Sequence, residues 1–346
     1  MNNFEIAGIS VAPGELKFGT VPVGQWRGGL PASIPLIVMH GVSEGPKLWV
    51  DACIHGNEVL NIEVIRRIMR EEINPQKLCG TIVAVPVVNP FAFHVGHRGT
   101  PLVQDVEDVT DVHGVFPGDP QGTLNDRLAH RVFSLMLSCN YVVNLHQNTS
   151  PAVPFTGVAT CKNQEILLAS VELAEAFGLP LTEMKVDVEQ TTSPAAPVGW
   201  PILATLAAGK PTFIVELPPT GYIYEPSVQL GVLGLRNVLR HLNMLDGQPQ
   251  PLPDLKVPPG RYGRYFINSN TGGLVHFRKD VGDWANAGEV IAIIRDVYGD
   301  IVDEIEVPRQ GYIRTLLFGP HNEAIYEGAI VASVLEVDPT RTHFFD

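Results

Sequence analysis

The sequence predicts an α/β fold that is followed by a small all-β domain. Three apolar, largely β-branched runs are typical of strands covered on both faces, at 81–88, 141–145 and 212–217. Further segments show helical spacing of apolar residues, at 124–137, 164–177 and 228–242. Because strands and helices alternate in this way, we expect one layered sheet with flanking helices over about the first 245 residues.

The N-terminal part begins with two predicted strands and an amphipathic helix. Apolar runs at 36–39 and 48–54 predict the strands, and the Gly- and Pro-containing segment 43–46 predicts a turn between them. Over 59–69 apolar residues recur with helical spacing, and charged residues fall between them. A strand therefore runs through the segment 55–58 into a helix.

The composition changes at the Pro-rich polar segment 246–253, which has no periodicity and is typical of a linker. Short apolar runs punctuated by glycines follow it, at 273–277, 290–294 and 329–334. Short strands with regular turn signals indicate a small β-rich domain of the barrel or sandwich kind. We therefore expect two domains, 1–247 and 254–346, of which the first carries the chemistry.

The composition argues against several classes of protein. Of the 346 residues 45% are hydrophobic and 18% are charged, so the chain can bury a large core and is unlike a disordered protein. Lys+Arg 24 against Asp+Glu 37 gives a net charge of −13, which argues against nucleic acid and anionic membranes as partners. No signal peptide and no membrane-spanning run is recognisable, so we expect a cytoplasmic protein. The four cysteines lie far apart, which signals neither a thiolate zinc site nor a disulfide framework.

His55, Glu58 and His146 form the sharpest chemical signal. His55 and Glu58 stand three apart at the entrance of the first predicted helix, so their side chains can point to the same side. His146 lies at the carboxyl end of an apolar strand, the edge at which open α/β sheets build their sites. Two histidines and a glutamate are ligands that zinc accepts, and three protein ligands leave a position for a water molecule whose pKa the metal lowers. The sequence therefore predicts one catalytic zinc ion per chain, although Co, Mn or Fe could occupy the same ligand set.

Glu216 and Arg98 are expected to complete the chemistry. Glu216 lies within the apolar run 212–217, so its carboxylate should emerge at the same sheet edge as His146 and act as general base and acid. Arg98 lies in the segment that leaves the strand ending at Val88, again at this edge. Hydrolysis of an amide builds negative charge on the carbonyl oxygen, and we assign Arg98 to stabilise that charge. The alternatives are a buried glutamate paired with an arginine, and a surface arginine.

These motifs resemble the succinylglutamate desuccinylase/aspartoacylase family of zinc amidohydrolases, relatives of the zinc carboxypeptidases. The likeness covers nearly the whole chain, with short motifs in the family's order: His-Gly-Asn-Glu at 55–58, Asn-Pro at 89–90, Phe-Pro-Gly at 116–118, Leu-His at 145–146 and Val-Glu-Leu at 215–217. The resemblance implies a zinc carboxypeptidase-like mixed sheet with flanking helices and a small C-terminal all-β domain. It implies the same roles: His55, Glu58 and His146 as zinc ligands, Glu216 as general base and acid, and Arg98 as the group that polarises the carbonyl. Because family members are often dimers, it also leaves a homo-oligomer open.

The substrate side departs from the family's pattern. In the family an Asn-Arg pair commonly precedes Phe-Pro-Gly and holds a substrate carboxylate, whereas this chain has His113 and Gly114 there. Gly114 lacks the bidentate guanidinium that suits a carboxylate, so N-acylaspartate and succinylglutamate are doubtful substrates. We assign substrate contacts to Asp111, His113 and Tyr326, the last by its resemblance to a substrate-contacting tyrosine of aspartoacylases. The acidic run 105–111 is either a solvated surface or a feature that favours a cationic substrate.

The expected function is zinc-dependent hydrolysis of a linear amide, by a deacylase of a small N-acyl amine or N-acyl amino acid. The first alternative is a non-catalytic zinc-dependent protein that binds a small molecule, which the lost carboxylate clamp favours. Retention of Glu216 and Arg98 argues against it, because a pure binding protein has no need of a positioned base. A carboxypeptidase is the second alternative, and Gly114 weakens it since such an enzyme also needs an arginine for the terminal carboxylate.

Overall fold

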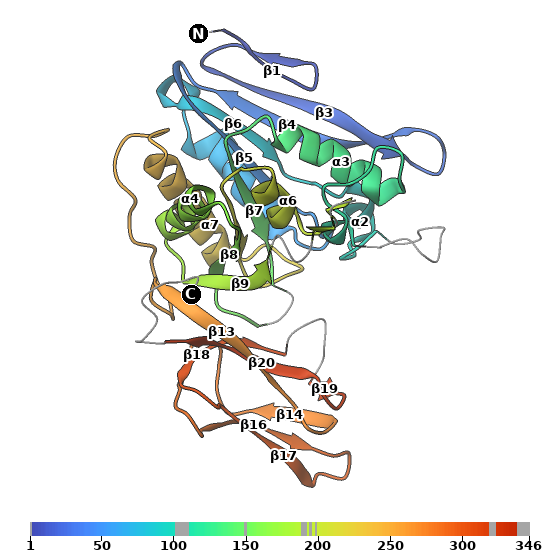
Figure 1. Ribbon diagram of the computed structural model, residues 1–346, viewed down its shortest axis with the longest axis vertical. Coiled ribbons are helices and arrows are strands. Elements are labelled where there is room, and N and C mark those ends of the chain that lie inside the picture. Colours follow the sequence, from blue (N-terminus) through green and yellow to red (C-terminus); the bar gives the residue numbers. More distant parts are fainter. Residues whose placement is uncertain are drawn as a thin grey trace.

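The fold is organised around one large mixed sheet (Figure 1). The computed structural model describes residues 2–100, 111–148, 151–187, 192–193, 196–197, 199–317 and 323–337. Within these ranges the sheet has twelve strands, in the spatial order β15 (Trp284–Ala285), β18 (Gly311–Leu316), β20 (Ile330–Glu336), β13 (Arg261–Asn268), β9 (Leu181–Asp187), β8 (Phe155–Thr160), β12 (Thr212–Glu216), β7 (Tyr141–His146), β5 (Ser43–Ala52), β6 (Cys79–Val85), β4 (Pro31–His40) and β3 (Glu15–Gln25). Short hairpins of the described chain lie outside it, formed by β1 (Phe4–Ile6) with β2 (Ile9–Val11) and by β10 (Thr192–Ser193) with β11 (Ala196–Pro197). The predicted α/β fold with a layered sheet is confirmed.

The central strands β5, β6, β7 and β12 run parallel to one another. β5 pairs with β6 and β7, and β7 pairs with β12. Their residues are the apolar, β-branched runs of the sequence, which fit strands covered on both faces. β4 and β8 flank them in antiparallel pairs with β6 and β12. Parallel central strands place the carboxyl ends of β5, β7 and β12 at one edge of the sheet.

The predicted turn at 43–46 is wrong. Strand β5 already begins at Ser43, which pairs with Cys79 of β6. The register of this pair shifts between Ser43 and Lys47, and a Cβ added at Gly45 would lie 2.8 Å from Gly80 N. The glycine and the proline of this segment therefore mark an irregular stretch of strand with close backbone approach, and not a turn.

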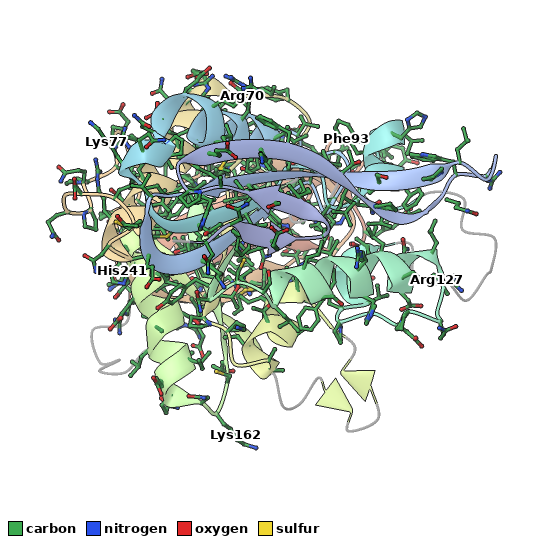
Figure 2. All side chains as sticks on the ribbon, turned by 90° about the horizontal axis from the view of Figure 1, so that it is seen from above. Arg70, Lys77, Phe93, Arg127, Lys162 and His241 are labelled. Carbon is green, nitrogen blue, oxygen red and sulfur yellow. The ribbon has the colours of Figure 1, made fainter. Side chains whose placement is uncertain are left out.

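Helices cover both faces of the sheet. One face carries α1 (Leu60–Arg67), continued by the π-helix η1 (Ile68–Glu72), together with α4 (Gln164–Phe177) and α7 (Glu225–His241), and these share a core with the strands. The other face carries α3 (Leu124–Met136) and a second core. Figure 2 shows Arg70 of η1 and Arg127 of α3 on opposite sides of the strands. Shorter helical segments lie in the connections: η2 (Pro75–Lys77), α2 (Pro90–Val95), η3 (Val112–Gly114) and α6 (Pro201–Ala207).

Local sequence determines where the helices begin and end. Thr123 and Asp126 form a capping box at the start of α3, in which each side chain accepts a hydrogen bond from the other's backbone N–H. Asn163 caps α4 by accepting hydrogen bonds from two backbone N–H groups, and Gly178 ends that helix at a left-handed φ of 101°. The predicted helix 164–177 is therefore observed with the same bounds.

The C-terminal residues form short strands, as the sequence predicts. Four of the described strands make a second sheet, in the order β17 (Ile301–Glu306), β16 (Val290–Arg295), β14 (Gly273–Phe277) and β19 (Ala324–Ile325). β13 instead extends the large sheet, because it pairs in parallel with β9. The segment 246–253 contains no helix or strand, and the division into domains 1–247 and 254–346 stays a prediction. No helix in the described part of the chain is long and apolar enough to cross a bilayer.

Candidate active site

Three strand ends bring the predicted metal ligands and Glu216 together. His146 is the last residue of β7 and Glu216 the last of β12, and the two are direct partners across this parallel pair. β5 ends beside β7, so the chain passes into His55 at the same edge. Glu58 follows just before α1. The structure therefore gathers these residues at one edge of the sheet.

The loop that carries His55 has a constrained backbone. Cys53 has a φ of 54°, in the left-handed region that is unfavourable for residues other than glycine and recurs at functional sites. Gly56 packs against α2, where an added Cβ would lie 2.1 Å from the carbonyl carbon of Ala92. Gly56 N also donates a hydrogen bond to Arg98 O at 3.2 Å. Only glycine fits at position 56, and its close packing fixes the His55 loop against the segment that carries Arg98.

Glu58 lies buried between two imidazoles. Glu58 Oε1 is 2.6 Å from His55 Nδ1, and Glu58 Oε2 is 3.3 Å from His146 Nδ1. Gln147 N donates a further hydrogen bond to Glu58 Oε2 at 3.1 Å. Burial would raise the pKa of Glu58, but His55 and His146 hold this pKa well below its usual range. Burial would likewise lower the pKa of His55, yet Glu58 and Asp111 raise it to about 9.

His55, Glu58 and His146 could hold a metal ion. One ligand atom of each lies within 4.8 Å of the others, and all three residues are buried. The buried Nε2 of His55 makes no hydrogen bond, and Asp111 Oδ1 lies 3.4 Å from it. Buried polar atoms normally have a partner. An imidazole nitrogen without a hydrogen bond therefore fits a metal ion, which accepts the lone pair of that nitrogen. Two imidazoles and a carboxylate are also a donor set that suits zinc.

Arg98 and Asp111 border these candidate ligands. Arg98 Nη1 lies 3.5 Å from Glu58 Oε1, and Arg98 Nε lies 3.3 Å from Asp111 Oδ2. The Arg98 side chain is 45% exposed and that of Glu58 is 1% exposed, so the guanidinium stands between the buried ligands and solvent. Burial would raise the pKa of Asp111, but His55 and Arg98 hold it well below its usual range. Asp111 is therefore an anion that helps to fix the guanidinium.

His113 packs its imidazole against the candidate ligands. Its ring centroid is 5.3 Å from that of His55, 5.2 Å from that of His146 and 5.4 Å from that of Trp200. Burial, followed by the neighbouring charges of His146 and His55, holds the pKa of His113 well below its usual range. An uncharged imidazole both donates and accepts hydrogen bonds, so His113 can offer a substrate either kind of contact.

Tyr326 lies apart from the other predicted site residues. It follows β19, which Figure 1 places among the C-terminal strands and away from the ends of β5 and β7. Its side chain is 89% exposed, and its carbonyl oxygen accepts a hydrogen bond from Ser269 Oγ at 3.2 Å. The substrate contact assigned to Tyr326 stays a prediction. Of the acidic run 105–111, residues 105–110 lie outside the described residues.

Glu216 is half-buried beside His146. Leu217 N donates a hydrogen bond to His146 O at 2.9 Å, which joins the end of β12 to the end of β7. The pKa of Glu216 is raised, mainly because the carboxyl group is buried. The charge of His146 opposes this shift, and the charge of Glu58 adds to it. A carboxyl group with a raised pKa takes up and returns a proton more readily near neutral pH.

A buried network beside the site was missed by sequence reasoning. Asp51 accepts hydrogen bonds from Trp49 Nε1 at 2.6 Å and from Asn144 Nδ2 at 2.9 and 3.1 Å. Burial raises the pKa of Asp51 to about 6, although both hydrogen bonds lower it. Asn144 lies two residues before His146, so the network stiffens the strand that presents this histidine. The signal in the sequence was a charged residue inside an apolar strand, since such a residue needs polar partners.

Gln147 was also missed. Its Oε1 accepts a hydrogen bond from Leu60 N at 2.7 Å, and its Nε2 donates one to Pro219 O. Gln147 thus links the first turn of α1 to the segment that follows Glu216. Its position directly after His146 was the sequence signal, because a polar side chain at a strand end is free to brace the surrounding loops.

The chain is similar to known proteins over most of its length. A family model described as the succinylglutamate desuccinylase/aspartoacylase catalytic domain matches residues 44–242, which is more than half of the chain. A succinylglutamate desuccinylase/aspartoacylase structure from Rhodobacter sphaeroides superposes with a TM-score of 0.76 at 22% identity, covering 93% of this chain and 95% of that chain. The product-bound ectoine utilization protein EutE (DoeB) from Ruegeria pomeroyi gives a TM-score of 0.77 at 22% identity, with 94% and 98% covered. An aspartoacylase family protein from Mesorhizobium loti gives 0.73 at 20% identity, with 94% and 96% covered.

At these identities the solved structures establish a shared fold, and no curated protein sequence matches the chain. The family model supplies the stronger relationship. It spans the loop that carries His55 and the strands that end in His146 and Glu216. The chain therefore belongs to the succinylglutamate desuccinylase/aspartoacylase family of hydrolases.

Proposed function

We propose that this chain is a zinc-dependent hydrolase that cleaves a linear amide bond, as a deacylase of an N-acyl amine or an N-acyl amino acid. The main support is the convergence of His55, Glu58 and His146 at the sheet edge where Glu216 also ends its strand. These three residues would hold the ion through two imidazole nitrogens and one carboxylate oxygen. When bound, zinc would supply a Lewis acid for the scissile carbonyl and would lower the pKa of a water molecule.

Glu216 carries the proton in this scheme. Its carboxyl group has a raised pKa and lies beside His146, so it accepts a proton from the attacking water and donates it to the departing nitrogen. The carbon–nitrogen bond breaks, the acyl carbon gains the oxygen of water, and the amine leaves with the transferred proton. Proton donation matters because an unprotonated amide nitrogen is a poor leaving group.

Arg98 and His113 surround the carbonyl group in this scheme. Glu58 and Asp111 fix the partly exposed guanidinium of Arg98, so it can donate hydrogen bonds to a carbonyl oxygen as negative charge develops there. Uncharged His113 and anionic Asp111 face the same space and are assigned to substrate contact. Asp111 can accept a hydrogen bond and His113 can donate one, which suits an amide because it carries both a donor and an acceptor.

A positioned base favours an enzyme over a protein that only binds a ligand through zinc. Such a binding protein would need His55, Glu58 and His146 and nothing more at this edge. Glu216 would then have no role in binding, although burying a carboxylate is unfavourable. Its register with His146 supports a role in the reaction.

Metal analysis combined with a hydrolysis screen tests the proposal. We expect about one zinc ion per chain in the wild type and its loss in His146→Ala. The screen covers N-acyl amines, N-acyl amino acids and primary amides, and turnover of any of them should disappear in Glu216→Gln while zinc is retained. Zinc without turnover on the whole panel would contradict the deacylase. Absence of metal from both proteins would contradict the ligand assignment.

A further inference from the structure

Arg314 is a buried arginine that has no part in the reaction described above. It lies in β18 and is 2% exposed. Its guanidinium carbon lies 3.9 Å from the ring centroid of Phe155, and its Nη1 donates a hydrogen bond to Ser333 Oγ at 2.9 Å. Stacking on an aromatic ring fixes the plane of a guanidinium, and the hydrogen bond fixes its rotation within that plane. The guanidinium is therefore held in one place.

A β-bulge gives Arg314 its direction. Ile313 pairs with Val334 and Thr315 pairs with Ser333, so that Arg314 is the extra residue between two consecutive pairs of β18 with β20. A bulge of this kind re-aims one side chain without ending the strand, and bulges are common next to active sites. The bulge thus releases Arg314 from the regular alternation of its strand.

Backbone hydrogen bonds join β18 to the segment that leads into β8. Val153 N donates to Arg314 O at 2.9 Å, and Leu316 N donates to Pro151 O at 3.0 Å. Phe155, which carries the stacked guanidinium, is the first residue of β8. The C-terminal strands therefore bring Arg314 to the large sheet by pairing, and not by a side-chain contact alone.

Glu216 lies between Phe155 and His146 on one face of the large sheet. Phe155 and Glu216 are direct partners in the antiparallel pair of β8 with β12, and Glu216 and His146 are direct partners in the parallel pair of β12 with β7. Side chains of direct partners emerge on the same face, and neighbouring strands are about 4.8 Å apart. The candidate base is therefore flanked by a candidate metal ligand on one side and by the ring that carries Arg314 on the other.

Arg314 and Glu216 carry opposite charges that stabilise one another. Burial and then the charge of Arg264 lower the pKa of Arg314 to about 9, while the charge of Glu216 opposes them. Burial raises the pKa of Glu216, and the charge of Arg314 opposes this shift together with the charge of His146. Half-buried Arg264 of β13 is a second cation on which the charge of Glu216 acts. Glu216 is therefore the anion that compensates these arginines.

We propose that Arg314 is a positioning residue for Glu216, so that the C-terminal strands take part in the reaction. The fixed guanidinium attracts the carboxylate and holds it on the face that it shares with His146. Without this attraction, the negative charge of Glu58 would repel the Glu216 carboxylate, which would spend less time in the reactive direction. The inference rests on the proposed function, because it concerns the base of that reaction.

Kinetics of zinc-loaded full-length variants test this role on any N-acyl amide that the wild type hydrolyses. Arg314→Gln should lower kcat about 10- to 100-fold and change KM less than about twofold, because the metal ligands and the substrate contacts stay in place. Arg314→Lys keeps the charge and should recover part of the loss. Arg278→Gln changes an exposed arginine directly after β14 and should keep the wild-type kcat. Zinc content is measured in every variant.

A double-mutant cycle with Glu216→Gln separates positioning from a purely structural role. In the Glu216→Gln background, Arg314→Gln should lower the residual kcat less than about twofold, because no base remains to be positioned. A loss as large as in the wild-type background would show that Arg314 acts through the fold, and would overturn the proposal. A wild-type kcat in Arg314→Gln would also overturn it.

Urea unfolding of the metal-free proteins gives the same cycle without turnover. Glu216→Gln should favour the folded state more in the Arg314→Gln background than in the wild type, because in the wild type it also removes an attraction. Equal changes in the free energy of unfolding would show that the two residues do not interact, and would overturn the proposal. If Arg314→Gln does not fold, Ser333→Ala takes its place, because it removes the hydrogen bond that fixes the guanidinium. In that variant kcat should fall about 3- to 10-fold, and an unchanged kcat would again contradict the role of Arg314.

The outcomes for Arg314 and for the deacylase are distinguishable. Turnover with a wild-type kcat in Arg314→Gln would remove the role of Arg314 and leave the deacylase standing. Turnover of no amide would count against the deacylase, while the unfolding cycle would still decide whether Arg314 holds Glu216.

Discussion

Glu216 and His146 are direct partners in the parallel pair of β12 with β7, and the hydrogen bond from Leu217 N to His146 O, at 2.9 Å, holds the two strand ends in register. Backbone pairing, and not the packing of a flexible loop, therefore fixes the candidate base beside a candidate metal ligand. Substitutions that keep the shape of either side chain should change the chemistry and leave the position of the site unchanged.

Glu216→Gln should show whether this carboxyl group carries the proton. Glutamine keeps the shape of the side chain but cannot accept a proton, so kcat should fall about 10²- to 10⁴-fold while zinc is retained. Steady-state kinetics on any amide that the wild type hydrolyses, with elemental analysis, provide the measurement. Glu172→Gln, at an exposed position of α4, is the control and should keep full kcat. A wild-type kcat in Glu216→Gln would remove this residue from the reaction.

Zinc affinity should rise with pH. The pKa of His55 is about 9 in the metal-free protein, so its imidazole is protonated at neutral pH, whereas zinc binds the neutral form. Each zinc ion must displace a proton, and the Kd for zinc should fall about tenfold per pH unit until it levels off above about pH 9. Competition with a chromophoric chelator across this range measures the Kd. A Kd that does not change with pH would show that His55 is already neutral.

Without zinc, the contribution of His55 to stability should have the opposite pH dependence. The pKa of His55 is raised from 6.5 to about 9, so its stabilising contribution is complete below the unfolded value and is lost as pH rises through about 9. The Tm of the metal-free wild type should therefore approach that of metal-free His55→Gln as the pH rises. Two Tm curves that stay parallel from neutral to alkaline pH would contradict the raised pKa.

Asp51→Asn should remove a pH-dependent loss of stability. Burial raises the pKa of Asp51 from 3.8 to about 6, so its contribution is complete below the unfolded pKa and is lost as pH rises through about 6. The shift corresponds to about 3 kcal/mol as an upper limit. An asparagine can still accept from Trp49 Nε1 and can donate to Asn144 Oδ1, which has no hydrogen bond in the described chain. Urea unfolding at acid and neutral pH should show the wild type losing stability relative to the variant, and equal changes in both proteins would refute this titration.

Gly56→Ala should damage the metal site through the backbone. The new Cβ would lie 2.1 Å from the carbonyl carbon of Ala92, which belongs to a helix and cannot move aside without strain. We expect a loss of about 1–3 kcal/mol in the free energy of unfolding, together with weaker zinc binding because His55 moves with the loop. Gly28→Ala, where a Cβ would meet nothing within 4 Å, is the matched control. The idea fails if both variants match the wild type in Tm and zinc affinity.

The residues at the sheet edge were predictable because their signal is local. His146 and Glu216 each end an apolar run, and the carboxyl ends of parallel strands meet at one edge. Strand β3 escaped prediction because it is an edge strand that contains Gly19 and Pro22, and an edge tolerates residues that would break a central strand. The helical pattern that continues to Met69 became α1 followed by a π-helix, since side-chain spacing does not reveal a change in hydrogen-bond pattern.

Arg314 could not be placed from the sequence. Its position depends on a bulge in β18 and on the packing of that strand against Phe155, which lies far away in the chain. No local pattern states which C-terminal strand meets which part of the large sheet. The substrate contact of Tyr326 was inferred from a resemblance alone and stays a prediction, and its side chain is exposed.

The parallel pairing of β9 with β13 joins the C-terminal strands to the large sheet. Leu181 N donates a hydrogen bond to Gly260 O at 2.8 Å, and Arg261 and Tyr262 continue the pairing. A protein truncated within 246–253 would leave β9 as an open edge, whose unpaired N–H and C=O groups invite association with other chains. Such a fragment should elute as aggregates in size-exclusion chromatography, so shortened proteins made for crystallisation or enzyme engineering need to retain the C-terminal strands.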